Sequence, residues 1–170
     1  QVWRKARIAT DSGRSRSAKQ ALEIVQPSSV REWAQVWAQP SKWLGHHASN
    51  PRAASSEMAV LALLRWVSME PEQASRVLRT VWQPVLSAEQ RDWVWGALGR
   101  QSAMRLDDDA MGFFDKVSQP AHLSDDMLSW LVRAALRAER VPQWKKVEEA
   151  IRAMSPAHRQ DPSWVYWLAR

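Results

Sequence analysis

Apolar residues recur at helical spacing along almost the whole of this sequence. Residues three or four positions apart lie on one face of an α-helix, so a set spaced i, i+3, i+4 and i+7 predicts a helix with one buried face. The clearest sets begin at Ala59, Ala74, Ala110, Met127 and Val147, and a shorter one begins at Trp164. No stretch alternates apolar and polar residues for long enough to form a sheet. The predicted fold class is therefore all-α.

Capping signals set the expected helix boundaries. Capping boxes, in which two side chains satisfy free backbone N–H groups reciprocally, are expected at two pairs: Ser29 with Glu32 and Ser87 with Gln90. Asn50 and Asp161 each precede a proline, which suits the first helical position, and Ser124 precedes two aspartates. The predicted helices cover residues 2–9, 15–25, 29–38, 51–68, 71–83, 87–104, 109–117, 124–139, 142–153 and 162–170, with a short turn or helix near 40–46.

The helical faces also recur at a regular period. Faces that begin at Ala74, Ala110 and Val147 are offset by 36 and 37 residues, and a second series gives offsets between 33 and 37. Periods of this size are typical of stacked helical hairpins, so we predict an α-solenoid, a superhelix of antiparallel hairpins with a period of about 33–37 residues. A compact helical bundle with accidental spacing is the alternative.

The organisation that follows is a single superhelical segment over residues 1–170. Its first fifty residues are less regular, and residues 51–170 carry the clear hairpin repeats. Because an apolar pattern still runs through residues 164–170, we expect this sequence to be a piece of a longer protein.

Two features of composition bear on function. Twelve tryptophans stand against two phenylalanines and one tyrosine, and indole rings serve both helix packing and binding surfaces. The net charge of +6 favours anionic partners such as nucleic acid, acidic lipid or an acidic cell-wall polymer, although it also serves simple solubility. Cysteine is absent, which excludes disulfides, and no apolar stretch is long enough to span a bilayer.

No residue set predicts a metal or cofactor site. Asp107, Asp108 and Asp109 lack the spacing of a calcium loop, and we interpret them as a cap for the helix that begins at Ala110. His46 and His47 are adjacent and would diverge on a helix, which makes a shared metal ion improbable. The remaining histidines, His122 and His158, are expected on the surface. No cofactor and no metal is therefore predicted.

No residue is assigned a catalytic role either. Glu148 and Glu149 are neighbours on a helix and diverge, so they do not form the carboxylate pair of a glycosidase. Arginine and tryptophan lie close together at three places, which could allow stacking on bases of single-stranded nucleic acid. The favoured interpretation is a buried indole beside a solvated guanidinium in each pair: Arg65 with Trp66, Arg79 with Trp82, and Arg91 with Trp93.

The last third of the sequence resembles a known family. Residues 130–137 (Trp-Leu-Val-Arg-Ala-Ala-Leu-Arg) and 144–151 (Trp-Lys-Lys-Val-Glu-Glu-Ala-Ile) form a hairpin, followed by Met-Ser-Pro at 154–156 and Arg159. The string Trp-Val-Tyr-Trp-Leu-Ala-Arg then occupies 164–170. This order is similar to the U-shaped superhelical domain of the soluble lytic murein transglycosylases of the Gram-negative periplasm. The resemblance covers about residues 55–170.

The resemblance implies a helical scaffold attached to a lysozyme-like catalytic domain elsewhere in a full-length protein. Such a domain cleaves between N-acetylmuramic acid and N-acetylglucosamine without water and leaves a 1,6-anhydro end. Its catalytic glutamate is followed by serine, and none of the nine glutamates here has that neighbour. No catalytic residue of the family is therefore carried over to this chain.

The expected function is that of a noncatalytic scaffold segment of a periplasmic lytic transglycosylase. Its expected partners are peptidoglycan glycan strands, the catalytic domain of the same full-length chain, and other cell-wall enzymes. A solenoid adaptor of the tetratricopeptide type, which binds a protein partner in its groove, is the alternative. Nucleic-acid binding is the least favoured reading.

Overall fold

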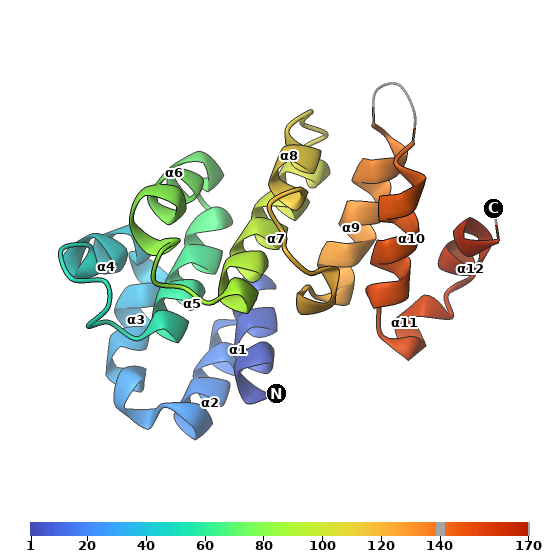
Figure 1. Ribbon diagram of the computed structural model, residues 1–170. Coiled ribbons are helices and arrows are strands. Elements are labelled where there is room, and N and C mark those ends of the chain that lie inside the picture. Colours follow the sequence, from blue (N-terminus) through green and yellow to red (C-terminus); the bar gives the residue numbers. More distant parts are fainter. Residues whose placement is uncertain (139–141, 170) are drawn as a thin grey trace. The chain divides into compact units, whose positions relative to one another are not determined.

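The computed structural model describes residues 1–138 and 142–169, and these residues are all-helical (Figure 1). The prediction of an all-α fold is confirmed, since no strand occurs in this described part. The first helices are α1 (Val2–Asp11), α2 (Ser15–Val25), α3 (Val30–Ala38), α4 (Pro40–His47), α5 (Ser56–Val67), α6 (Pro71–Val77) and α7 (Ala88–Met104). The later helices are α8 (Ala110–Phe114), α9 (Asp125–Leu136), α10 (Trp144–Ala153), α11 (Pro156–Arg159) and α12 (Pro162–Leu168). Short segments η1 (Pro27–Ser29), η2 (Leu78–Trp82) and η3 (Pro120–His122) lie between them.

The chain divides into two compact units, Gln1–Val94 and Trp95–Arg170. In the first unit α5 is the central helix, because α1, α3, α4 and α6 all pack against it. Seven consecutive residues of α5 are almost completely buried: Met58, Ala59, Val60, Leu61, Ala62, Leu63 and Leu64. A helix that is apolar on all sides needs neighbours on all sides. Helix α5 thus forms the core of this unit.

The second unit contains a helical hairpin. Helices α9 and α10 pack along each other and run in opposite directions (Figure 1). The face of α9 is built from Met127, Leu131 and Ala135, which are buried as their spacing predicts. The hairpin agrees with the prediction for this part of the chain. The regular solenoid array stays a prediction.

A glycine allows close packing in the second unit. A Cβ atom added to Gly99 of α7 would lie only 2.8 Å from the ring of Phe114 at the end of α8. Such a distance is shorter than any normal carbon contact, so an alanine here would force the aromatic ring out of its place.

Three of the predicted helix caps are confirmed, and α1, α2 and α6 begin at residues 2, 15 and 71 as predicted. Ser87 and Gln90 form the expected capping box, in which the Gln90 amide N–H donates to Ser87 Oγ and the Ser87 amide N–H donates to Gln90 Oε1. Ser124 Oγ accepts a hydrogen bond from the Met127 amide, and Asp161 accepts one from the Ser163 amide. Each bond satisfies a backbone donor that the first helical turn leaves free.

Other predicted boundaries are wrong. Helix α5 begins at Ser56 rather than at residue 51, because Ser55 and not Asn50 caps it. Ser29 and Glu32 do not form a capping box, since the Ser29 hydroxyl accepts a hydrogen bond from Gln26 Nε2 and Glu32 accepts one from Trp43 Nε1. Ser29 is thus used by a residue that precedes it, and Glu32 is used by a residue of the next helix.

Further differences concern short segments. The helix predicted over 71–83 is divided into α6 and the π-helical segment η2, and the helix predicted over 109–117 covers only α8. The short element expected near 40–46 is α4, and α11 was not predicted. The predicted ends at residues 139 and 170 lie outside the described residues.

Four tryptophans that lie on the predicted apolar helix faces divide into two groups by their burial. Trp66 and Trp82 are buried, as predicted. Trp130 and Trp167 are only partly buried. The guanidinium of Arg133 lies 5.0 Å from the Trp130 ring centroid, so this indole is covered by a solvated cation rather than by a helix.

We expect the replacement Trp82→Ala to lower the free energy of unfolding by about 3–5 kcal/mol. The side chain is 0% exposed and its ring stacks on Trp43 with 6.3 Å between centroids, so its loss leaves a large cavity. Urea unfolding followed by far-ultraviolet circular dichroism measures the change. Trp144→Ala is the matched control, because Trp144 is 42% exposed and its removal costs much less. Equal losses in the two variants would contradict this assignment of the core.

Candidate functional site

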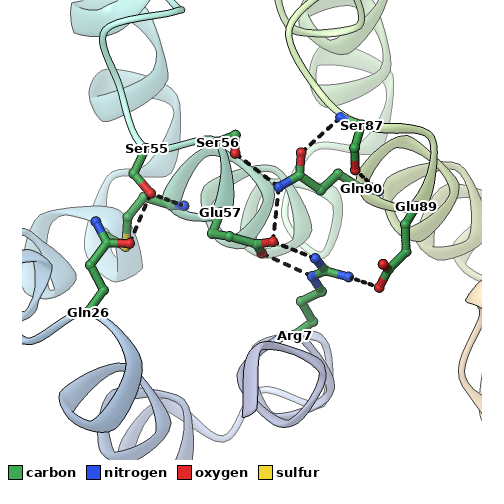
Figure 2. A network of polar contacts seen from close by, with 9 residues as sticks. Arg7, Gln26, Ser55, Ser56, Glu57, Ser87, Glu89 and Gln90 are labelled. Atoms are coloured by element: carbon green, nitrogen blue, oxygen red, sulfur yellow. Dashed lines mark hydrogen bonds and ion pairs between the residues drawn. The ribbon is translucent and has the colours of Figure 1, made fainter. Parts of the chain in front are cut away.

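Arg7 lies at the centre of a buried polar network in the first unit (Figure 2). It belongs to α1, and its side chain is only 4% exposed. The role of Arg7 was not predicted from the sequence. The one available signal was its place among Ala6, Ala9 and Thr10, which lie on the buried face of the same helix.

The guanidinium of Arg7 binds two carboxylates. Its Nη2 donates to Glu57 Oε1 at 2.6 Å and its Nε donates to Glu57 Oε2 at 3.1 Å, which makes a bidentate pair. Its Nη1 donates to Glu89 Oε1 at 2.7 Å. Glu57 and Glu89 lie in the first turns of α5 and α7, where the positive end of the helix dipole favours negative charge. One cation therefore joins the starts of two helices to α1.

The network extends through Gln90 (Figure 2). Its Nε2 donates to Glu57 Oε1 and to Ser56 Oγ, each at 3.0 Å, while its Oε1 serves the capping box of α7. On the other side, Ser55 Oγ donates to Gln26 Oε1 at 3.2 Å. Both oxygens of Glu57 are thus occupied by donors. The Glu57 carboxylate is therefore engaged in contacts between helices rather than directed at a substrate.

The carboxylate and histidine candidates do not gather at one place. Helix α8 begins directly after Asp109, but no carboxylate of 107–109 makes the expected capping bond, because Asp109 is its N-cap residue without a side-chain hydrogen bond. The rings of His46 and His47 meet edge to face with 5.1 Å between centroids. Within residues 1–138 and 142–169, no group of three or more potential ligands could hold a metal ion.

For the remaining candidates, one prediction is wrong and one is confirmed. His158 was expected on the surface but is half-buried in α11, and its Nε2 lies 2.9 Å from Ser129 Oγ. Glu148 and Glu149 diverge as predicted. Glu148 pairs with Arg152, and Glu149 pairs with Lys145.

The favoured interpretation of the arginine–tryptophan pairs is correct for the three indoles but wrong for two of the arginines, because Arg65 and Arg91 are half-buried and donate hydrogen bonds to backbone carbonyl groups. The indoles of Trp66, Trp82 and Trp93 are buried. Arg65 covers the ring of Trp37 at 4.5 Å instead of its neighbour in sequence, and Arg79 is exposed. These tryptophans are core residues and are not available to stack on bases.

A cluster of three aromatic rings, of which two are exposed and Trp167 is partly buried, lies in the second unit, where α10 meets α12. We call Trp144, Tyr166 and Trp167 the aromatic surface. The centroids of Trp144 and Trp167 are 5.8 Å apart, and those of Tyr166 and Trp167 are 5.1 Å apart. Trp144 is 42% and Tyr166 is 54% exposed, and Val165 and Leu168 beside them are exposed as well. This gathering of exposed apolar groups makes the aromatic surface a candidate for binding.

Two local features position the aromatic surface. Trp164 anchors α12, because its buried ring contacts His158 and lies 5.4 Å below the guanidinium of Arg133. Asp161 caps the same helix at the start, with Pro162 at the first helical position. The hydrogen bond from the Ser163 amide, supported by the Ser163 side chain, lowers the pKa of Asp161 from its ordinary value of 3.8. The periodic set that begins at Trp164 predicted a helix with a buried face here, but it did not indicate that Tyr166 is exposed.

Comparison with models of known protein families and with curated proteins finds no match to this chain. None of the helices in the described part of the chain has both the length and the apolar content needed to cross a bilayer. The site geometry therefore carries the functional argument by itself.

We expect Arg7→Met to lower the free energy of unfolding by about 2–3 kcal/mol, because it removes the cation from the Glu57 carboxylate, which is only 17% exposed. Chemical denaturation of the purified chain measures this loss. The control Arg152→Met removes the exposed pair with Glu148 and should cost less than about 1 kcal/mol. A loss for Arg7→Met no greater than that of the control would show that the network does not hold the unit together.

A second expectation concerns pH. The lowered pKa of Asp161 means that its capping bond stabilises α12 fully above pH 3.8 and is lost as the pH falls through the lower folded-state pKa. The chemical shift of the Ser163 backbone amide, followed by nuclear magnetic resonance, should titrate with a midpoint below 3.8. Asp161→Asn should abolish this titration. A midpoint at or above the ordinary value would contradict the cap.

Proposed function

We propose that this chain is a noncatalytic helical scaffold that binds glycan strands of peptidoglycan, and that it is a segment of a periplasmic lytic transglycosylase. The single observation that carries the proposal is the aromatic surface of Trp144, Tyr166 and Trp167. It lies in the same part of the chain as the sequence resemblance to that family.

The chemistry of the aromatic surface suits a polysaccharide. Each sugar ring of a glycan has faces lined by C–H groups, which pack well on the flat, apolar body of an indole or phenol ring. Trp144 and Trp167 lie close enough for one sugar unit to touch both rings. Their polar N–H and the Tyr166 hydroxyl group provide hydrogen-bonding atoms of the kind that glycan hydroxyl and N-acetyl groups require.

Charge around the aromatic surface supports the same ligand. Lys145 follows Trp144 directly and its side chain is 89% exposed. The whole chain has a net charge of +6. The peptide stems of peptidoglycan carry carboxylates, so a basic surface beside stacked sugars would attract them. Such attraction weakens when salt screens it.

The roles of the glutamates support a noncatalytic part. Cleavage of a glycosidic bond needs an acid within hydrogen-bond reach of the leaving oxygen. Glu57 and Glu89 bind Arg7, Glu32 binds Trp43, and the pair in α10 binds neighbouring cations. We therefore assign bond cleavage to a catalytic domain elsewhere in the full-length protein.

The proposal predicts that the chain sediments with purified peptidoglycan sacculi and that soluble tetra-N-acetylchitotetraose competes with this binding. The double replacement Trp144→Ala and Tyr166→Ala should reduce the bound fraction about tenfold, since two stacking rings are lost. We expect no anhydro-muropeptides in the supernatant, as judged by mass spectrometry.

Met69→Ala is the matched control, because Met69 is a similarly exposed apolar residue in the other unit. Its binding should equal that of the unchanged chain. Undiminished binding by the double variant would remove the aromatic surface from the proposal. Equal binding of the chain to single-stranded DNA would favour a general anion-binding role instead.

A further inference from the structure

A groove lies between α1 and α2 in the first unit. Its volume is about 380 Å³. The residues that line it are Val2, Lys5, Ile8 and Ala9 from α1, Arg14 between the helices, and Ser17, Gln20, Ala21 and Ile24 from α2. This groove is separate from the Arg7 network, which uses other side chains.

The lining residues form two parallel stripes. On α1 they follow at intervals of about one turn, from Val2 through Lys5 to Ala9, and on α2 they run from Ser17 to Ile24. Each stripe covers about two turns, or roughly 10 Å along its helix. A groove bounded by two such stripes has the direction of the helix axes. It accommodates an elongated ligand better than a compact one.

The floor and the rim of the groove differ in chemistry. Ala9 and Ala21 are buried and small, which lets another backbone approach closely. Ile24 at the end of the groove is 73% exposed, the most exposed large apolar side chain among the described residues. The other faces of the two helices are used, because α1 packs on α5 and α2 packs on α3. The groove thus exposes apolar side chains of both α1 and α2, and no other helix of the described structure covers them.

The rim is positively charged. Lys5 and Arg14 are both exposed, and within the described residues their side chains make no hydrogen bond or ion pair. The first 25 residues contain six basic and only two acidic residues. A ligand for this groove therefore needs an apolar face and negative charge beside it.

We propose that the groove between α1 and α2 binds an amphipathic α-helix with an acidic polar face, supplied by a partner protein. The apolar side chains of such a helix would contact Ile8, Ala21 and Ile24, and its carboxylates would pair with Lys5 and Arg14. A third helix would then pack onto two neighbouring helices, which is also how the helices of this unit bury their own faces. This proposal is independent of the glycan-binding function and involves the other unit.

A stapled peptide tests the proposal. The probe is an 18-residue, fluorescein-labelled helix with leucine on one face and glutamate on the other, held helical by a hydrocarbon staple because short helices are marginal in water. Fluorescence anisotropy should show saturable binding to the chain. Ile24→Glu should weaken binding about tenfold, as expected for the loss of one buried aliphatic side chain.

Reversal of the charges on the rim of the groove tests the proposal more sharply than Ile24→Glu does. The double variant Lys5→Glu and Arg14→Glu should lose the glutamate peptide and gain binding to the same peptide with lysine in place of glutamate. Lys42→Glu makes the same charge change on α4, outside the groove, and should leave binding unchanged. Thermal unfolding of each variant establishes that it is folded.

Three results would overturn the proposal. The first is equal binding of a peptide whose leucines are replaced by serine, which would mean charge attraction alone. The second is binding that neither Ile24→Glu nor the double variant reduces. The third is failure of the peptide together with tight binding to phosphatidylglycerol vesicles that Ile24→Glu abolishes, which would make the groove a lipid site. Failure to bind sacculi bears only on the glycan proposal.

Discussion

The guanidinium of Arg7 binds carboxylates from the first turns of α5 and α7, and the arrangement of residues 1–94 depends on that pairing. Carboxylates at helix starts already interact with the helix dipole, so Arg7 completes a charge arrangement that each helix begins by itself. A buried ion pair adds less to stability than its short distances suggest, because both groups lose their water. We infer that its main contribution is specificity, because a helix shifted by one turn would leave the guanidinium of Arg7, which is only 4% exposed, without its carboxylates. The network thereby fixes the position of α1, whose opposite side forms the groove with α2.

The two candidate binding surfaces have different origins. The aromatic surface exists because α12 buries the indole of Trp164 and leaves the side chain of Tyr166 exposed. The groove exists because α1 and α2 bury the small residues Ala9 and Ala21 at its floor and leave Ile24 exposed at its end. In both cases a short helix buries one stripe and exposes another. Recognition surfaces of this kind are a normal product of hairpin packing, since each hairpin has one side that its own neighbours do not cover.

Helical periodicity was sufficient to predict the fold class and the buried face of α9, because burial in that helix follows the 3.6-residue repeat. In α5 the periodic residues are buried as well, but so are the residues between them, which the period alone does not predict. Local capping chemistry predicted Ser87 with Gln90, where both partners lie three residues apart. It failed for Ser29 and Glu32, because Ser29 accepts a hydrogen bond from Gln26 before it and Glu32 accepts one from Trp43 of the next helix. Arg7 could not be found from spacing, since its partners lie 50 and 82 residues away. The aromatic surface was missed for a related reason: periodicity identifies an apolar face but does not tell whether a neighbour covers it.

The π-helical segment η2 has a consequence for changes in chain length. The Gln83 amide donates to the Leu78 carbonyl five residues earlier, at 2.7 Å, so this turn contains one residue more than an α-helical turn. Deletion of one residue from the segment would turn this bond into an ordinary α-helical one and would keep the hydrogen-bonded ladder continuous. Elsewhere in a helix, a deletion rotates every later side chain by about 100° around the axis. Loss of a single codon is therefore tolerated better at residues 79–81 than in the middle of α5, and a related sequence that is one residue shorter is expected to lack its residue here.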